Sequence, residues 1–175
     1  MMIKHILTIV FLGGVAFGQS TAPKVTAAPV GTVTVRQGSK AKLEMNFRVA
    51  PGFHINSNKP TSDLYIPTAV KLDVPTDLSI VKLEYPQGEL ISFPFDPDTK
   101  LSVYTGDIAV KGTVVALKTT GRGTFRVHGN LRYQACDNRA CYPPTTVPVT
   151  FDVKVEKAAS TTVRHNPPQS PHAHN

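Results

Sequence analysis

Apolar and polar residues alternate along three long stretches of the chain, at residues 41–49, 124–134 and 147–156. An alternation with a period of two predicts β-strands that bury one face and expose the other. The apolar rows consist of Ala41, Leu43, Met45, Phe47 and Val49; Phe125, Val127, Leu131 and Tyr133; and Val147, Val149, Phe151, Val153 and Val155.

Shorter apolar runs predict the remaining strands. Pro51–Gly52 predicts a turn, and residues 53–60 predict a short extended piece followed by irregular chain. Gly112 is expected to interrupt the strand that contains it, and the proline-rich segment Pro86–Thr99 is expected to be a connection. Four further strands are expected at Thr32–Arg36, Val70–Val74, Leu78–Leu83 and Ile108–Leu117.

The composition agrees with an all-β fold. The 175 residues include 15 prolines and no tryptophan, and no long segment has the apolar spacing of a helix. This length suggests one domain that can bury a sizeable core. About seven to nine short strands at this spacing favour a β-sandwich over a closed barrel.

The two ends of the chain differ from its middle. The first 18 residues are typical of a signal peptide, because Lys4 precedes an apolar run at residues 6–17 that is too short to span a bilayer. Small residues at the end of this run predict cleavage before Gln19 and export from the cytoplasm. The folded domain is then expected over residues 19–157, followed by a disordered tail at residues 158–175 that is rich in Ser, Thr, Pro, Asn and His.

The charge pattern narrows the classes of function. The formal net charge is +7, and removing Lys4 with the leader lowers it by one, but the basic residues are spread along the polar faces of the strands. This distribution favours a solvated cationic surface over a surface that binds nucleic acid or a membrane. A Gly-rich phosphate loop, a Ser-His-Asp arrangement and paired carboxylates are also missing from the sequence. We therefore expect no cofactor, no bound metal, no nucleic-acid partner and no small-molecule substrate.

The stretch from Tyr133 to Pro144 contains the only two cysteines, Cys136 and Cys141, in the connection between two predicted strands. In an exported protein this pair can be oxidised and stay oxidised. A static, structural disulfide is one interpretation. Closing a loop of about six residues, however, stabilises a fold by only about 2 kcal/mol, against almost 5 kcal/mol for about a hundred residues. A disulfide that opens and recloses by thiol exchange is the other interpretation.

Residues around the cysteines favour exchange at the second sulfur. Arg139 lies inside the loop and favours a nearby thiolate, whereas Asp137 opposes a thiolate on the cysteine that directly precedes it. The chemistry therefore points to Cys141 as the more acidic thiol. Pro143–Pro144 restricts the backbone after this cysteine and pushes Tyr142 toward an extended conformation, which would hold the sulfur in a defined place.

These residues carry a resemblance to a known family. Tyr-Gln-Ala-Cys at residues 133–136 and Cys-Tyr-Pro-Pro at residues 141–144, followed by a Val-rich final strand, resemble the signature of the N-terminal periplasmic domain of the bacterial thiol:disulfide interchange protein DsbD. Pro-Gly-Phe-His at residues 51–54 resembles a Gly-aromatic segment of that family. Tyr-Pro-Gln-Gly at residues 85–88 resembles the segment before its cap loop. The order of features agrees from about Gly31 to Val155.

The resemblance implies an immunoglobulin-like β-sandwich in the periplasm with protein-disulfide reductase activity. Members of the family pass electrons from a membrane-embedded reductant, through a thioredoxin-like domain, to disulfide isomerases and cytochrome c maturation factors. By resemblance, Cys141 forms the mixed disulfide with partners and Cys136 resolves it. The resemblance also implies a flexible cap over the disulfide at residues 91–95, in which Phe93 or Phe95 is the covering ring.

The chain departs from the family's archetype at three points. Four residues separate the two cysteines, where the archetype has five. Ile91 and Ser92 stand where acidic residues precede the cap aromatic. No transmembrane helix follows the predicted domain, so we expect the membrane-embedded reductase to be a separate chain.

Several other residues allow two interpretations. His54 could tune the disulfide or be a hydrogen-bonded bystander, and Tyr104 and Tyr133 could line the site or fill the core. The histidines of the tail could bind a metal weakly, although solvated chain is the simpler interpretation. For the whole protein, the alternative to a disulfide carrier is a binding or adaptor module with a structural disulfide. Periplasmic copper handling would require metal binding that does not depend on the tail.

Overall fold

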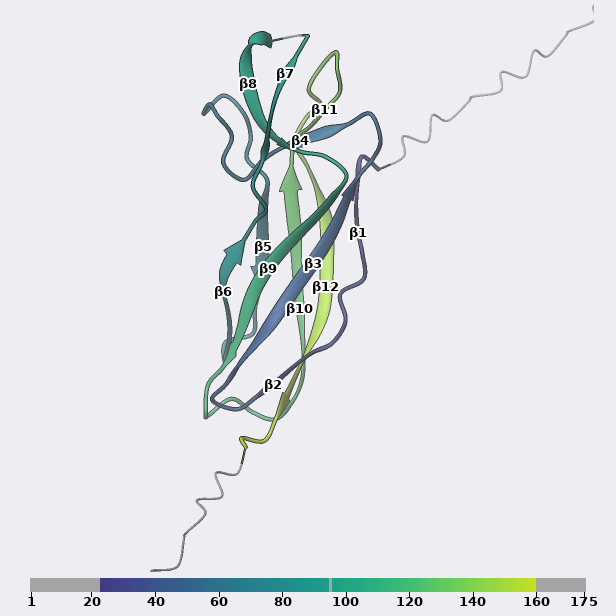
Figure 1. Cartoon of the computed structure of the whole chain (residues 1–175). Helices are drawn as coiled ribbons and strands as arrows, with labels where there is room; N and C mark the ends of the chain where they lie inside the picture. Colours follow the sequence, from purple (N-terminus) through teal and green to yellow (C-terminus); the bar gives the residue numbers. More distant parts are fainter. Residues whose placement is uncertain (1–22, 95, 160–175) are drawn as a thin grey trace, which may run out of the picture.

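The predicted strands form a structure without helices in the described part of the chain (Figure 1). The computed structural model describes residues 23–94 and 96–159; the predicted signal peptide, Phe95 and residues 160–175 of the predicted tail lie outside them. None of the described residues therefore belongs to a helix able to span a bilayer. The strands are β1 (Val25–Ala27), β2 (Val33–Arg36), β3 (Lys40–Val49), β4 (His54–Asn56), β5 (Ala69–Asp73), β6 (Leu78–Glu84), β7 (Glu89–Phe93), β8 (Asp96–Tyr104), β9 (Asp107–Ala116), β10 (Gly123–Tyr133), β11 (Ala135–Cys136) and β12 (Thr145–Glu156).

Two four-stranded sheets form the body of the molecule. One has the strand order β1-β3-β9-β6 and the other β2-β12-β10-β5. The longest pairing joins β10 to β12 in antiparallel register, from Gly123 opposite Val155 to Tyr133 opposite Thr145. Together these sheets are the immunoglobulin-like β-sandwich that the sequence predicts, and Figure 1 shows them running side by side along the long axis.

The core lies between the two sheets and contains the predicted apolar rows. Because neighbouring side chains of a strand point to opposite faces, each row turns one whole face inward. Burying each large apolar side chain stabilises the fold by about 1.5–3 kcal/mol. The rows that meet in this core include Leu43, Met45, Phe47 and Val49 of β3, Val127, Leu131 and Tyr133 of β10, and Val149, Phe151, Val153 and Val155 of β12.

A third sheet, with the order β11-β4-β8-β7, closes one end of the sandwich (Figure 1). Three of its strands are continuations of sandwich strands: β4 follows β3, β9 follows β8, and β11 follows β10 after the single residue Gln134. Gly52 and Gly106 lie at two of the bends with φ angles of 81° and 59°, a backbone region that glycine enters without steric cost. The sandwich therefore carries its own strands into the sheet that contains the cysteines.

Two sequence-based expectations are wrong, one about a connection and one about a strand. Pro86–Thr99 is largely strand, because Ile91 and Phe93 of β7 pack with Leu101 and Val103 of β8 in a small separate core. The prolines lie at the ends of these strands or on the outer hairpin, where a missing N–H is tolerated.

Gly112 does not interrupt its strand, since β9 runs through it in register with β3. A Cβ atom at this position would approach side-chain atoms of Leu83, Ile80 and Leu43 within 3.2–3.6 Å. The glycine therefore makes room for its neighbours and leaves the backbone extended. The structure also has a strand before the first predicted one: β1 pairs Val25 with Val49 of β3.

The close approach of β10 to β5 gives a test of the fold. A Cβ atom added at Gly129 would collide with the backbone oxygen of Lys71 and lie 3.1 Å from the Cα atom of Leu72. Because backbone atoms cannot move aside locally, we expect Gly129→Ala to lower the free energy of unfolding by about 1–3 kcal/mol, measured by chemical denaturation. Gly121→Ala is the control, since nothing lies within 4 Å of its added Cβ atom. Equal denaturation midpoints for the two variants would contradict the described packing of β5.

Candidate functional site

Cys136 and Cys141 form a disulfide at the edge of the third sheet. The sulfur atoms are 2.04 Å apart and the Cα atoms 4.0 Å apart. Cys136 belongs to β11 and has 0% of its surface exposed, whereas Cys141 lies in the exposed chain that follows. In the oxidised form, Cys141 is open to solvent, where a thiolate of another protein can approach it, and Cys136 is covered.

Asp137 closes the loop between the two cysteines from inside. Its Oδ1 atom accepts hydrogen bonds from the backbone N–H groups of Arg139 at 2.7 Å and Ala140 at 2.9 Å. Its Oδ2 atom accepts a hydrogen bond from the Tyr142 hydroxyl at 2.7 Å. These bonds lower the pKa of the Asp137 carboxyl to about 2, with the tyrosine as the largest cause. The loop is therefore held by a permanent carboxylate as well as by the disulfide.

The half-buried side-chain amide of Gln134 ties the other side of the loop to the sheet. Gln134 donates a side-chain hydrogen bond to the backbone oxygen of Tyr142, and its Oε1 atom accepts one from the Asn56 side chain at 3.2 Å. The backbone N–H of Tyr142 donates to the oxygen of Ala135 at 2.8 Å. Sequence reasoning did not single out Gln134 or Asn56. The available signal was the polar character of Asn56 in a short predicted extended piece and of Gln134 directly before a cysteine, since polar groups that become covered need a partner.

Aromatic and cationic side chains surround the exposed side of the loop. The rings of Tyr142 and Phe53 lie 5.9 Å apart at 60°. The Lys24 ammonium lies 4.2 Å from the Tyr142 ring centroid and 5.5 Å from that of Phe53, within the range of a cation–π contact. Lys24 was not predicted, since it is more than a hundred residues away in the sequence and no motif marks it.

His54 and Phe93 belong to two strands of the third sheet, β4 and β7, and their side chains are in contact. His54 stands directly opposite Cys136 in the antiparallel pairing of β4 with β11. Its ring stacks on Phe93 with a centroid distance of 3.9 Å and an interplanar angle of 13°. Both side chains are almost fully buried, and burial lowers the pKa of His54 while the nearby Asp137 carboxylate raises it. The structure thus brings His54 and one of the two candidate cap residues together; the other, Phe95, lies outside the described residues.

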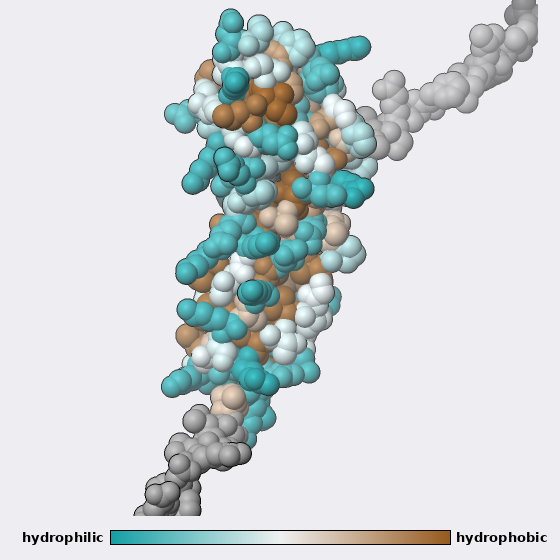
Figure 2. Space-filling model, viewed as in Figure 1, coloured by the Kyte–Doolittle hydropathy of each residue, from teal (hydrophilic) through white to brown (hydrophobic). Residues whose placement is uncertain are grey.

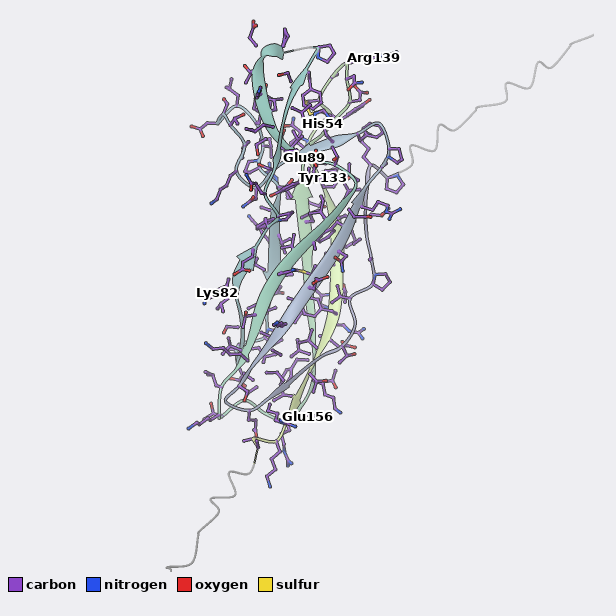
Figure 3. All side chains as sticks on the ribbon, in the orientation of Figure 1. His54, Lys82, Glu89, Tyr133, Arg139 and Glu156 are labelled. Atoms are coloured by element: carbon purple, nitrogen blue, oxygen red, sulfur yellow. A yellow bond between two sulfur atoms is a disulfide. The ribbon has the colours of Figure 1, made fainter. Side chains whose placement is uncertain are left out.

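The remaining predicted residues lie in three different parts of the fold. Arg139 is exposed at the tip of the cysteine loop, and Figure 3 shows it above His54. The Tyr104 hydroxyl lies 2.6 Å from Asn58 Oδ1 and 3.0 Å from the Pro86 oxygen, so it joins two loops beneath the third sheet. Tyr133 is packed in the sandwich core, and burial raises its pKa.

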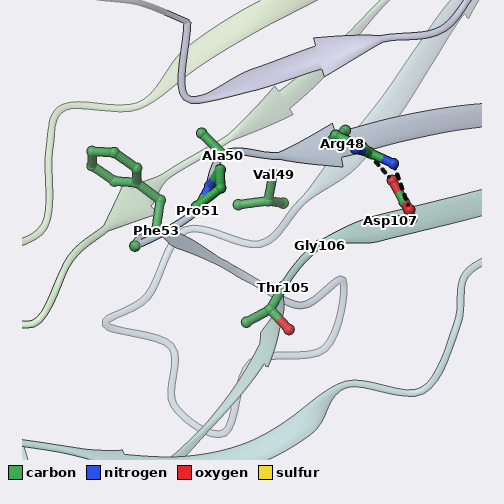
Figure 4. Close-up of a pocket in the computed structure, with 9 residues that line it drawn as sticks. Arg48, Val49, Ala50, Pro51, Phe53, Thr105, Gly106 and Asp107 are labelled. Atoms are coloured by element: carbon green, nitrogen blue, oxygen red, sulfur yellow. Dashed lines mark hydrogen bonds and ion pairs between the residues drawn. The ribbon is translucent and has the colours of Figure 1, made fainter.

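A cleft lies beside the aromatic side of the loop. It has a volume of about 430 Å³ and is lined by the turn from β3 to β4, including Pro51 and Phe53, and by Thr105 and Gly106 (Figure 4). The ion pair between Arg48 and Asp107 crosses its rim, but both side chains are about 70% exposed, so the pair adds little stability.

The same end of the molecule exposes apolar surface. Leu64, in the loop before β5, is 89% exposed and Leu90 of β7 is 61% exposed. Figure 2 shows apolar surface at this end, surrounded by hydrophilic side chains. Within residues 23–94 and 96–159, no three His, Cys, Asp or Glu side chains come together in a way that could hold a metal ion.

Several solved structures have a similar chain path. The N-terminal domain of DsbD from Neisseria meningitidis in the reduced form is 23% identical, with a TM-score of 0.45, covering 74% of this chain and 83% of that one. The same domain in complex with the PilB N-terminal domain is 20% identical, with a TM-score of 0.40, covering 72% and 80%. A type I cohesin from Pseudobacteroides cellulosolvens is 15% identical, with a TM-score of 0.46, covering 81% and 98%.

The sequence comparison is more specific than the chain path. Comparison with curated proteins gives no match. Residues 22–153 match the family model described as "Thiol:disulfide interchange protein DsbD, N-terminal". The matched segment spans well over half of the 175 residues and includes both cysteines, His54 and Phe93. The chain therefore belongs to the family of DsbD N-terminal domains.

Proposed function

We propose that this protein is a periplasmic thiol-disulfide exchange protein that carries reducing equivalents through a reversible Cys136–Cys141 disulfide. The observation that carries the proposal is the unequal burial of the two cysteines, with Cys141 exposed and Cys136 fully covered. Exchange needs one sulfur that a partner can reach and a second that is kept for the intramolecular step. Membership of the DsbD N-terminal family supports the same chemistry.

In the loading half of the cycle, a donor thiolate attacks the Cys141 sulfur. The Cys136–Cys141 bond breaks, a mixed disulfide forms at Cys141, and Cys136 leaves as a thiolate that takes up a proton. The donor's second thiol loses its proton and attacks its own first sulfur, which releases Cys141 as a thiolate. The donor is now oxidised and the cysteine pair is reduced by two electrons.

In the delivery half, the Cys141 thiolate attacks a client disulfide. A new mixed disulfide forms at Cys141, and one client sulfur leaves as a thiolate. The sulfur of Cys136 then attacks Cys141, which reforms the internal disulfide and releases the second client sulfur. The client receives two electrons and the pair returns to its oxidised form.

The surroundings of the disulfide suit this cycle. Asp137, Tyr142 and Gln134 hold the loop by hydrogen bonds that do not depend on the S–S bond, so the loop can stay folded when the pair is reduced. Phe93 stacks on His54, which lies opposite Cys136, and this position supports a role for the ring as a shield that excludes stray thiols until a partner docks. Lys24 and Arg139 place positive charge around the exposed sulfur, which favours a thiolate.

The partners follow from the reaction and the family. Thioredoxin-fold proteins of the periplasm are the proposed donors and acceptors, with disulfide isomerases and cytochrome c maturation factors as the clients. The apolar run at residues 6–17 supports export. The reaction itself uses cysteine sulfurs alone and needs no cofactor.

The main test traps the mixed disulfide. We expect reduced Cys136→Ser to form a stable covalent complex through Cys141 with a thioredoxin-fold probe that keeps one active-site cysteine, activated as its nitrobenzoate mixed disulfide. Reduced wild type should form this complex only transiently, and Cys141→Ser should not form it. Non-reducing electrophoresis and mass spectrometry give the yield and the linked residues.

A potential measurement separates this function from a structural disulfide. A working exchange pair should have a reduction potential above about −300 mV, measured against glutathione. A value well below this, together with no complex from Cys136→Ser, would mean that the disulfide is a structural part of a binding or adaptor module.

Removing the covering ring tests the shield. The stack of Phe93 on His54 is worth about 1 kcal/mol, so its loss in Phe93→Ala should speed reduction of the disulfide by glutathione about fivefold. Leu90→Ala is the matched control, since Leu90 lies on the same strand and is 61% exposed. Equal rates in Phe93→Ala and wild type would show that the ring does not limit access.

Acid titration tests the carboxylate that holds the loop. The pKa of Asp137 falls from 3.8 to about 2 in the folded protein, so the folded state favours the ionised form. Its stabilising contribution is complete above about pH 4 and is lost as the pH falls through about 2. The stability of wild type relative to Asp137→Asn should therefore decrease in this window, measured by chemical denaturation of the oxidised proteins. Asp63→Asn, at an exposed aspartate, serves as control. If the difference in free energy of unfolding between wild type and Asp137→Asn does not change with pH, the Asp137 carboxylate does not stabilise the loop.

A further inference from the structure

His54 occupies a central position in the third sheet. It lies on β4, between β11 and β8, and is 3% exposed. Side chains directly opposite each other on antiparallel strands share a face, with Cβ atoms about 4.5–5.5 Å apart. The pairing of His54 with Cys136 therefore sets the imidazole beside the buried cysteine, and Figure 3 shows His54 below the loop that carries Arg139.

One ring nitrogen of His54 has no partner among the described residues. The Nε2 atom is buried, and none of the side chains or backbone groups in residues 23–94 and 96–159 forms a hydrogen bond with it. Leaving a buried polar atom without a hydrogen bond is unfavourable. Such an atom at a site of chemistry is therefore expected to have a function in another state of the site.

The groups around the imidazole keep it neutral at neutral pH. Burial lowers its pKa below the usual 6.5, and the one charge that acts against this is the Asp137 carboxylate that follows β11. From β7 the facing group is the Phe93 ring, and β8 presents the uncharged residues Val103 and Tyr104 opposite β4. A neutral imidazole has one nitrogen that carries a proton and one that can accept a proton.

The reduced form of the site creates a need for such an acceptor. Cys136 has no exposed surface, and burial in apolar surroundings raises the pKa of a thiol. Only the thiolate is an effective nucleophile. Solvent reaches the covered thiol poorly, so a base within the sheet would be required for it to react quickly.

We propose that His54 is the general base that removes the proton from Cys136 when this cysteine resolves the mixed disulfide. The proposal rests on the exchange function proposed above and assigns its proton-transfer step. The proton passes from the Cys136 sulfur to Nε2 as the sulfur attacks Cys141. The Cys136–Cys141 bond forms, the bond between Cys141 and the client breaks, and the client leaves as a thiolate. The imidazolium then returns the proton to this thiolate or to water.

Asp137 assists this step without touching the sulfur. Its carboxylate stays ionised through its bonds to Tyr142, Arg139 and Ala140. A fixed negative charge near His54 favours the imidazolium that forms during the transfer. In reverse, when a donor reduces the disulfide, the His54 imidazole first takes up a proton from water and then passes it to the Cys136 thiolate as this sulfur leaves.

The test uses the small disulfide 5,5′-dithiobis(2-nitrobenzoate) on the reduced protein in a stopped-flow instrument. Attack by Cys141 releases the first nitrobenzoate thiolate, and resolution by Cys136 releases the second. General-base catalysis contributes about 10²–10⁴-fold. We therefore expect His54→Gln to slow the second release about 100-fold at neutral pH and to leave the first within about twofold. His128→Gln, at an exposed histidine on β10, should change neither.

The pH profile distinguishes a base from a residue that only supports the fold. In wild type the second release should level off above the lowered pKa of His54, whereas in His54→Gln it should rise with hydroxide up to the thiol range. A wild-type profile that also rises steadily, or a second release unchanged in His54→Gln, would overturn the proposal. If His54→Gln does not fold, His54→Asn and the wild-type profile decide it.

The outcome is separable from that of the exchange function. If His54→Gln slows only the second release and the Cys136→Ser protein forms no complex with the thioredoxin-fold probe, His54 is a general base but the protein does not exchange disulfides with thioredoxin-fold partners. If the complex forms and the second release does not depend on His54, the exchange function is supported and the role of His54 as general base is wrong.

Discussion

The register between β4 and β11 determines which side chain lies beside the buried cysteine. This short pairing sets His54 opposite Cys136 and Ile55 opposite Ala135. A shift of one residue would turn every side chain of the pair to the other face, so the imidazole would leave the cysteine. The Asn56 side chain donates a hydrogen bond to Gln134, and Gln134 donates one to the Tyr142 backbone. These bonds hold β4, the start of β11 and the chain after Cys141 in this register. The sandwich below provides the rigid support for this arrangement.

The two cysteines have different environments because they lie on different kinds of backbone. Cys136 is in the short strand β11 and is fully buried, and Cys141 is in the exposed chain that follows the strand. Asp137 links the two environments, since it holds the loop and also acts on His54 through its charge. Its opposition to a thiolate on Cys136, expected from the sequence, is therefore only part of its effect.

The sequence predicts those parts of the fold that follow from a local alternation of apolar and polar residues. The rows of β3, β10 and β12 are long and strictly alternating, so their strands and buried faces follow from the sequence, as does the sandwich. The hairpin of β7 and β8 could not be predicted, because prolines flank it and its small core needs Tyr65 from a distant loop. For the candidate site, motifs and resemblance pointed to the cysteine pair, His54 and either Phe93 or Phe95. Gln134, Asn56 and Lys24 were not, because their roles depend on contacts between segments far apart in the chain.

The position of Lys24 has a consequence for how the domain can be attached to anything else. This residue immediately precedes β1, and its ammonium lies over the Tyr142 ring beside Cys141. At the other end of the chain, the 12 residues of β12 run roughly 36 Å away from the disulfide, toward the opposite pole of the sandwich (Figure 1). A tether, label or solid support joined after β12 would leave the end with the disulfide open, whereas bulk joined before β1 would crowd the exposed cysteine.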